Sequence, residues 1–178
     1  MSTDISEKGL ESLIVRHMTG TDGLAVAPGA LTEPPAPYGG TGYFAGSPKD
    51  YDRAHALDVA QLFAFLRGTQ PEAFKKLGMV DANDTKDVNR LKFLTRLSAE
   101  LGKRGVIDVL RKGIEHHPAG HFDLFYGTPS EGNAKAAALH AQNRFSVTRQ
   151  LAYSMDETRR ALDLGLFING LPIATFEL

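Results

Sequence analysis

The feature that most constrains the fold is the last stretch of the chain, LDLGLFINGLPIATFEL, at residues 162–178. Apolar side chains recur at every second position before Asn169-Gly170, and two such runs joined by Asn-Gly are typical of a β-hairpin. A hairpin this apolar has to bury a face against other elements, so the chain must build a sheet here. Each strand also carries one acid, Asp163 on the first and Glu177 on the second.

Whether these two acids meet depends on the register of the hairpin. A plain two-residue loop sets Asp163 opposite Phe176 and turns Glu177 to the other face. A three-residue loop, or a bulge at Gly170, shifts the pairing by one residue and brings both acids to one face. Two carboxylates there would suit Mg²⁺, which takes oxygen ligands and keeps several waters. In the alternative interpretation Asp163 is a strand-edge residue and Glu177 a solvated end, and the sequence leaves both open.

Composition narrows the class of protein. The 178 residues fit one domain, and a net charge of −1 gives no general signal for nucleic-acid binding. The absence of Cys excludes disulfides, thiolate metal sites and a Cys nucleophile. The N-terminus carries acids where a secretory leader needs positive charge, and no stretch approaches the roughly 20 apolar residues of a membrane span. We therefore expect a cytoplasmic protein with no membrane contact.

The patterns upstream predict helices followed by strands. Residues 19–48 hold seven Gly and five Pro and are expected to form a long loop with short strands at most. Apolar periodicity and capping signals predict helices at 6–18, 54–66, 85–101, 105–113 and within 130–143. A further short helix is expected to begin after an N-cap at Thr69, and Gly102 is expected to end the helix at 85–101. Strands are expected at 121–127, at 144–154 and in the hairpin. The expected fold class is α/β, a helix-rich N-terminal part packed on a small mixed β-sheet.

Several blocks together resemble one known family. DYDRAHALD, TQPE, RGVIDVLR and FINGLPIATFEL, all within residues 46–178, are similar in the same order to the N-terminal region of the R (restriction) subunit of type I restriction enzymes. The resemblance implies a restriction-endonuclease-like nuclease domain of the PD-(D/E)xK type. It also implies cleavage of double-stranded DNA, coupled in the parent enzyme to ATP-driven translocation, and partnership with modification and specificity subunits.

The resemblance assigns roles to particular acids. Asp163 matches the Asp of the motif and Glu177 its Glu, both as Mg²⁺ ligands and catalytic residues. The motif's Lys is expected two residues after Glu177, and the sequence ends at Leu178. We therefore expect residues 1–178 to form a single, incomplete endonuclease domain that cleaves DNA poorly by itself, with ATP bound only by motor domains outside it. An acid of the first helix often joins this kind of site, and Glu11, with Glu7 in reserve, is the candidate.

Three further residues are candidates for contact with DNA. Arg144, Arg149 and Gln150 lie on or beside the strand that precedes the hairpin. An Arg next to a nuclease centre could bind a DNA phosphate. A salt bridge to an acid of the same domain is an equally good interpretation. The competing function is a non-catalytic module that docks onto the motor or modification subunits.

Two other motifs are interpreted as structural. HHPAGH has a Pro and a Gly between its histidines, which implies a loop without the helical spacing or Cys partner of a metal site. Asp52 of DYDR is expected near a helix start, where an Asp favours the helix dipole.

Overall fold

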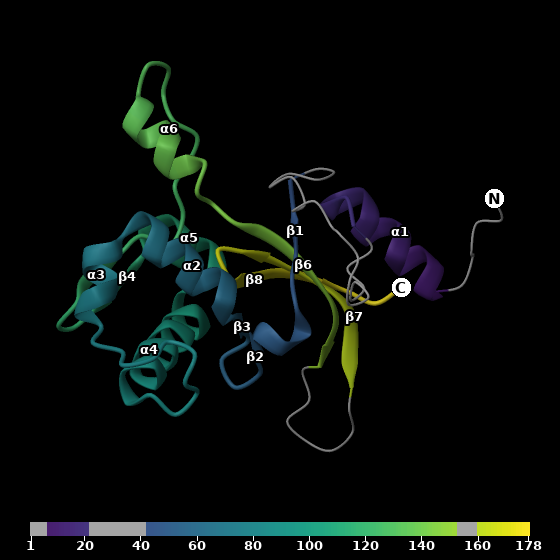
Figure 1. The fold of residues 1–178 in the computed structure, drawn as a ribbon, viewed down its shortest axis with the longest axis horizontal. Coiled ribbons are helices and arrows are strands. Elements are labelled where there is room, and N and C mark those ends of the chain that lie inside the picture. The colour runs from purple at the N-terminus through teal and green to yellow at the C-terminus, as the bar shows by residue number, and fades with distance from the viewer. Residues whose placement is uncertain (1–6, 22–41, 153–159) are drawn as a thin grey trace, which may run out of the picture.

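The computed structural model describes residues 7–21, 42–152 and 160–178. Helices and a mixed sheet make up this part of the chain, which confirms the mixed α/β class (Figure 1). The helices are α1 (Glu7–Thr19), the short 3-10 helix η1 (Pro48–Asp50), α2 (Val59–Thr69), α3 (Pro71–Lys76), α4 (Val88–Arg104), α5 (Val106–Lys112) and α6 (Ala134–His140). The strands are β1 (Phe44–Ala45), β2 (Tyr51–Asp52), β3 (Leu57–Asp58), β4 (Ile114–His116), β5 (Gly120–Phe122), β6 (Phe145–Ala152), β7 (Ala161–Ile168) and β8 (Leu171–Phe176).

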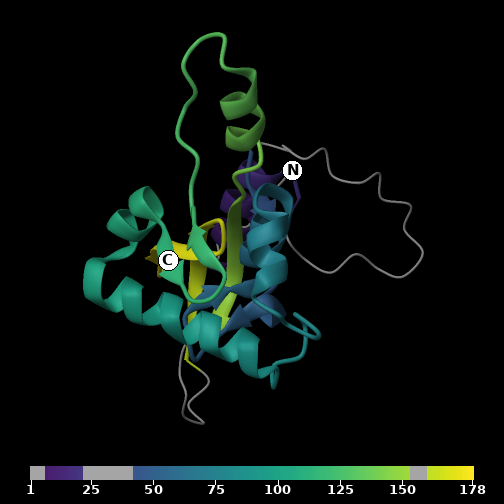
Figure 2. The ribbon, with the colours of Figure 1, turned by 90° about the vertical axis from the view of Figure 1, so that its left-hand side faces the viewer.

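The main sheet has four strands in the order β1-β6-β7-β8. Strands β6, β7 and β8 form an antiparallel meander, and the short β1 pairs in parallel with β6. Helices α2 to α5 gather at one end of this sheet and α1 lies at the other, while α6 stands out from the body in both views (Figures 1 and 2). Two small hairpins, β2-β3 and β4-β5, lie outside the main sheet.

Two apolar clusters hold these parts together. The larger joins α2, α4 and α5 to the hairpin, because Leu171 of β8 is fully buried among side chains such as Leu62, Phe93 and Leu97. The smaller cluster fastens α1 to the sheet through Val15 and its neighbours in β6 and β7. Burying a side chain of this size stabilises the fold by roughly 1.5–3 kcal/mol.

The first helix has the expected position and a different buried face. Of the apolar residues on one stripe of this helix, Leu10 and Leu13 are 45% and 56% exposed, and Ile14 is partly buried against the sheet. The face against the sheet carries Glu11, Val15 and Thr19, which follow one another at intervals of four residues. The helix therefore buries a carboxylate that its apolar pattern alone does not predict.

The region around the second helix departs from the sequence prediction. Residues 51–58 form the β2-β3 hairpin, so the helix expected from residue 54 begins at Val59. Asp58 caps it, accepting a 3.1 Å hydrogen bond from the Gln61 amide. Thr69 is the last residue of this helix, its hydroxyl donating to the Phe65 carbonyl, and does not cap the next one. Helix α3 begins at Pro71 with Gln70 at the N-cap position, one residue later than the predicted N-cap at Thr69 implies.

Three more boundaries differ. Helix α4 ends at Gly105, whose φ of 79° is a left-handed conformation, and runs through the expected stop at Gly102. Of the strand expected at 121–127 only β5 forms, paired with the unforeseen β4 across the HHPAGH turn. Of the 19–48 loop, residues 22–41 lie outside the described chain, and Phe44–Ala45 forms the short strand β1. In the described ranges, no helix has the length and apolarity needed to cross a membrane.

Candidate functional site

The hairpin turn is the two-residue Asn-Gly loop that the sequence predicts. Asn169 and Gly170 have φ of 50° and 81°, the positive pair that a tight hairpin turn of this kind requires. The Asn169 side chain is fully buried and fixes the turn, because its oxygen accepts from the Arg144 amide at 2.6 Å. Its nitrogen donates to the Leu124 carbonyl at 2.8 Å and to Asn143 Oδ1 at 3.0 Å.

A bulge then changes the register of the two strands. Ile168 pairs with Leu171, as a two-residue loop requires. The pairing shifts by one residue farther on, where Ile173 is an extra residue of β8 between two successive pairs. Beyond this bulge Leu164 pairs with Phe176. The shift that the sequence allowed at Gly170 therefore occurs at Ile173.

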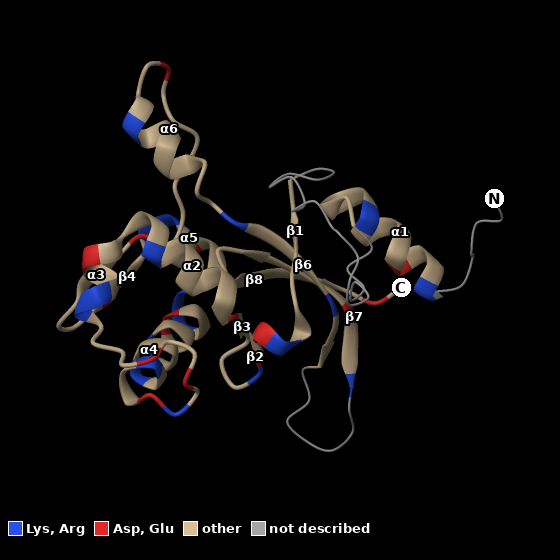
Figure 3. Ribbon diagram, viewed as in Figure 1, with Lys and Arg blue, Asp and Glu red and all other residues tan. Residues whose placement is uncertain are grey.

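The shifted register ends one position before the two acids of the hairpin, at the pair Leu164 and Phe176. Continuing the pairing by one position sets Asp163 opposite Glu177, and residues opposite each other in antiparallel strands share a face. The Leu178 amide donates a 2.7 Å hydrogen bond to Asp163 Oδ2, so the end of the chain stays beside β7. Figure 3 shows acidic positions at this end of β8 and on α1.

Gln150 completes the row on the other side of Asp163. The register of β6 and β7 is the same on both sides of this position, with Arg149 paired to Leu164 and Leu151 to Leu162, which sets Gln150 opposite Asp163. Its φ of 49° is left-handed, an uncommon conformation for a residue with a side chain. Strained backbone of this kind often occurs at functional sites.

The left-handed residue lets two consecutive side chains of β6 reach the same partner on α1. Arg149 Nε donates to Glu11 Oε1 at 2.8 Å, and Gln150 Nε2 donates to Glu11 Oε2 at 3.2 Å. Glu11 is 2% exposed and the Arg149 side chain 13% exposed, so this is a buried ion pair. Three of the predicted site residues thus form one cluster next to the strand of Asp163.

Arg144 lies elsewhere. Its Nε donates to Gln61 Oε1 at 2.7 Å, and its guanidinium lies over the Phe44 ring at 4.5 Å from the centroid. Six residues of extended strand separate it from Gln150, about 20 Å. The side chain of the reserve candidate Glu7 lies outside the described residues.

Within the described part of the chain, no three His, Cys, Asp or Glu side chains come together in a group that could hold a metal ion. Two carboxylates are still sufficient for Mg²⁺, which fills its remaining positions with water. The oxygen of Asp163 that the Leu178 amide leaves open, and the exposed Glu177, are donors of the right type.

Asp52 of the DYDR block has a structural position. It lies on β2 and not at a helix start. Its Oδ1 accepts from the His55 backbone amide at 3.2 Å and lies 2.9 Å from His55 Nδ1, while Oδ2 is 3.5 Å from Arg90 Nη2 of α4. Asp52 therefore ties the β2-β3 hairpin to the helical part.

The most perturbed carboxyl group is one that sequence reasoning missed. Asp58 is 1% exposed, and burial raises its pKa from 3.8 to about 6, against the lowering effect of the Gln61 amide. Its Oδ2 has no hydrogen-bond partner among the described residues. Helix-cap preference identifies such a residue only once the start of the helix is known, and the helix was expected to begin too early.

Comparison with known proteins identifies the family. The sequence model described as type I restriction enzyme R protein N terminus matches residues 83–178, more than half of the chain. The chain belongs to this family. The matched part of this R-protein region contains the whole β6-β7-β8 meander, with Asp163 and Glu177. The DYDRAHALD and TQPE blocks precede it. Searches of curated proteins and of solved structures found no significant match.

Proposed function

We propose that this R-protein region is an endonuclease domain that hydrolyses phosphodiester bonds of double-stranded DNA with Mg²⁺ held by Asp163 and Glu177. The observation that carries the proposal is the bulge at Ile173, because the shifted pairs run as far as Leu164 and Phe176 and, continued by one position, would set Asp163 opposite Glu177. β-Bulges are common next to active sites, where the extra residue changes the direction in which side chains point.

The topology supports the PD-(D/E)xK assignment. A helix precedes three antiparallel strands, the middle strand carries Asp163, and Glu177 follows the last residue of the third strand. This is the arrangement that the family resemblance implies for the nuclease fold. An ion at such a centre stabilises the charge that develops on a phosphodiester and activates a water.

The chain's own residues have distinct tasks in this proposal. Asp163 and Glu177 supply the oxygen ligands. The Leu178 amide orients the Asp163 carboxylate. Glu11 accepts hydrogen bonds from Arg149 and Gln150, and the three side chains fix the strand next to Asp163 as positioning residues.

Membership of the family extends the proposal to the whole enzyme. Translocation driven by ATP would belong to motor domains of the R subunit. Recognition of the DNA sequence would belong to a specificity subunit, and methylation to a modification subunit. None of these activities requires a residue of the pair at the end of the hairpin.

Calorimetric titration with Mn²⁺ tests the metal site on this chain. We expect binding to the parent protein and none to Asp163→Asn or Glu177→Gln. Glu131→Gln is the matched control, since Glu131 is an exposed acid before α6. Binding that survives both hairpin substitutions, in proteins shown to be folded by circular dichroism, would contradict the assignment.

Cleavage tests the function in the complete enzyme. In the intact R subunit assembled with its partners, Asp163→Asn is expected to abolish DNA cleavage while ATP hydrolysis continues. Cleavage at the normal rate would refute the nuclease role of Asp163.

The docking module remains the second candidate, and one observation favours it. Val88 and Leu91 on α4 are 62% and 38% exposed, whereas Leu94 and Leu97 of the same helix are fully buried. In this alternative, substitution of Asp163 leaves cleavage intact, while Leu91→Ser weakens assembly of the R subunit with its partners.

A further inference from the structure

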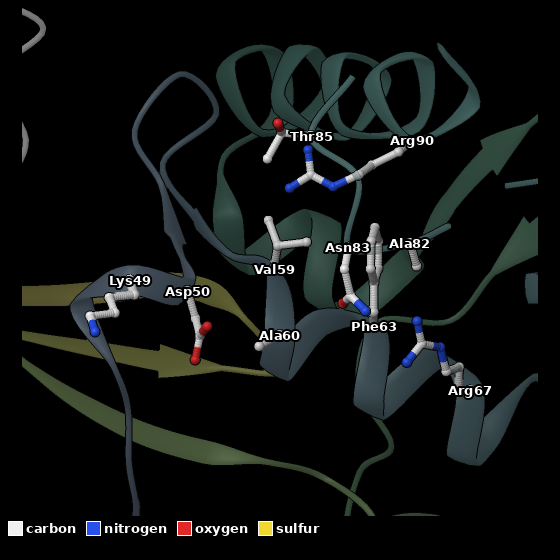
Figure 4. A pocket seen from close by; sticks show the side chains of 10 residues that line it. All are labelled: Lys49, Asp50, Val59, Ala60, Phe63, Arg67, Ala82, Asn83, Thr85 and Arg90. Atoms are coloured by element: carbon white, nitrogen blue, oxygen red, sulfur yellow. The ribbon is translucent and has the colours of Figure 1, made fainter. Parts of the chain in front are cut away.

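A cavity lies between η1, α2 and the segment that leads into α4. Its volume is about 300 Å³, at the small end of the range for ligand pockets. Figure 4 shows Arg90 entering from α4 and Arg67 from α2, with Phe63 and Asn83 between them in this view. The proposed nuclease centre does not involve this cavity, although Asp50 in its wall is the first residue of the DYDRAHALD block.

Arg90 lies in the wall of the cavity with incomplete pairing. The residue is 5% exposed, and its Nε has no hydrogen-bond partner among the described residues. Its one ion pair there is a long contact of 3.5 Å from Nη2 to Asp52 Oδ2. Buried polar groups are nearly always satisfied, so this guanidinium, which lines the cavity, is short of hydrogen-bond acceptors.

Arg67 presents a second guanidinium to the same space. It is exposed, and its contact over the Phe74 ring, 5.1 Å from the centroid, orients it without using its donors. Of the described carboxylates, none forms an ion pair with Arg67 or with Lys49, the third cation of the cavity. The single acid in the wall is Asp50, so cations outnumber acids by three to one.

The rest of the wall indicates the type of anion. Asn83 and Thr85 add neutral polar groups, while Val59, Phe63 and Ala82 provide an apolar side. Two planar guanidinium groups match the oxygens of a phosphate, and an apolar side suits the organic body of a ligand. Duplex DNA fits less well, because the backbone of a rigid duplex does not reach an Arg that is 5% exposed.

We propose that this cavity binds a small organic phosphate monoester, with its phosphate between Arg67 and Arg90 and its body against Val59 and Phe63. The site is independent of the acidic pair and requires no metal. Asp50 opposes the anion and sets the affinity lower than the cations alone would give.

Calorimetry in phosphate-free buffer tests the proposal, with ribose 5-phosphate, ribose and inorganic phosphate as probes. We expect ribose 5-phosphate to bind, inorganic phosphate to bind more weakly and ribose not at all. Arg67→Gln should weaken ribose 5-phosphate binding by about tenfold to a hundredfold, because it removes charge-assisted hydrogen bonds. Asp50→Asn should strengthen it. Arg111→Gln, an exposed Arg on α5, is the matched control and should have no effect.

Arg67 is the residue substituted in the test. Arg90 also contacts Asp52, so a substitution of Arg90 would perturb the fold. Absence of ribose 5-phosphate binding, or equal binding to the parent and to Arg67→Gln, would overturn the proposal. So would equal affinities for ribose 5-phosphate and inorganic phosphate, which would mean a site for the ion only. If a short DNA duplex binds in an Arg67-dependent way and ribose 5-phosphate does not bind, the cavity is a site for nucleic acid and the proposal of a small organic phosphate is wrong.

Discussion

Asn in place of Asp58 should stabilise the protein at neutral pH and leave its stability at low pH nearly unchanged. Asp58 is buried at the start of α2, where its ionised form is unfavourable and its pKa is raised from 3.8 to about 6. Asn keeps the oxygen that accepts from the Gln61 amide, so the helix cap survives. The substitution removes only the charge.

The magnitude and sign follow from the two pKa values. Between pH 3.8 and about 6 the folded protein holds a proton on Asp58 that the unfolded chain has lost, so stability falls as pH rises. The difference between the two pKa values corresponds to about 3 kcal/mol of folding stability. This stability is fully present below pH 3.8 and is lost above about pH 6. About 2 kcal/mol of it falls between pH 4.5 and 7.5.

Urea unfolding at a series of pH values, on the parent and on Asp58→Asn, measures this effect. The free-energy advantage of the variant should grow by about 2 kcal/mol from pH 4.5 to 7.5. Asp87→Asn is the matched control, because Asp87 caps α4 and amide hydrogen bonds from Arg90 and Val80 lower its pKa. For Asp87→Asn, the free energy of unfolding relative to the parent should fall as pH rises, opposite to the trend for Asp58→Asn. A constant difference for Asp58→Asn across this range would refute the argument.

Two further substitutions test the packing around the hairpin. Arg149→Leu leaves the buried Glu11 carboxylate without its cation and should cost about 3–5 kcal/mol in urea unfolding; a loss below about 1 kcal/mol would contradict a buried ion pair. Gly170→Ala should destabilise more than Gly132→Ala, since φ is positive at both but a Cβ at Gly170 meets the Asp58 backbone oxygen and one at Gly132 meets nothing within 4 Å. Equal thermal unfolding midpoints for these two variants would show that the turn tolerates the contact.

Local signals in the sequence predict the long elements and the hairpin turn. Helix α5 lies between two glycines of positive φ, and Asn169-Gly170 adopts the turn that this pair favours, because each depends on neighbouring residues alone. The small hairpins β2-β3 and β4-β5 have strands of two or three residues, too short for an alternation to appear. Their positions depend on contacts such as the one between Asp52 and Arg90, which join distant parts of the chain.

The sequence proposes Asp163 and Glu177 as the acids of the candidate site and leaves the register of their strands open. Alternation allows two pairings of the hairpin strands. The bulge at Ile173 that selects between them comes directly after Pro172, and a Pro inside a strand is a signal for a bulge or a sheet edge that alternation alone does not include. Glu11 belongs to a buried face only because Arg149, on a strand far along the chain, supplies its partner. Tertiary contacts of this kind decide where a polar residue is buried.

The most direct test of the account is the location of a bound metal. Crystals of this chain soaked in Mn²⁺ should give an anomalous difference peak between the Asp163 and Glu177 carboxylates, with an oxygen of each at about 2.0–2.3 Å, typical of small hard divalent cations. The same soak of Asp163→Asn crystals should give no peak there. Carboxylates on opposite faces of the hairpin, or Mn²⁺ bound elsewhere with none at this pair, would contradict the proposed nuclease centre.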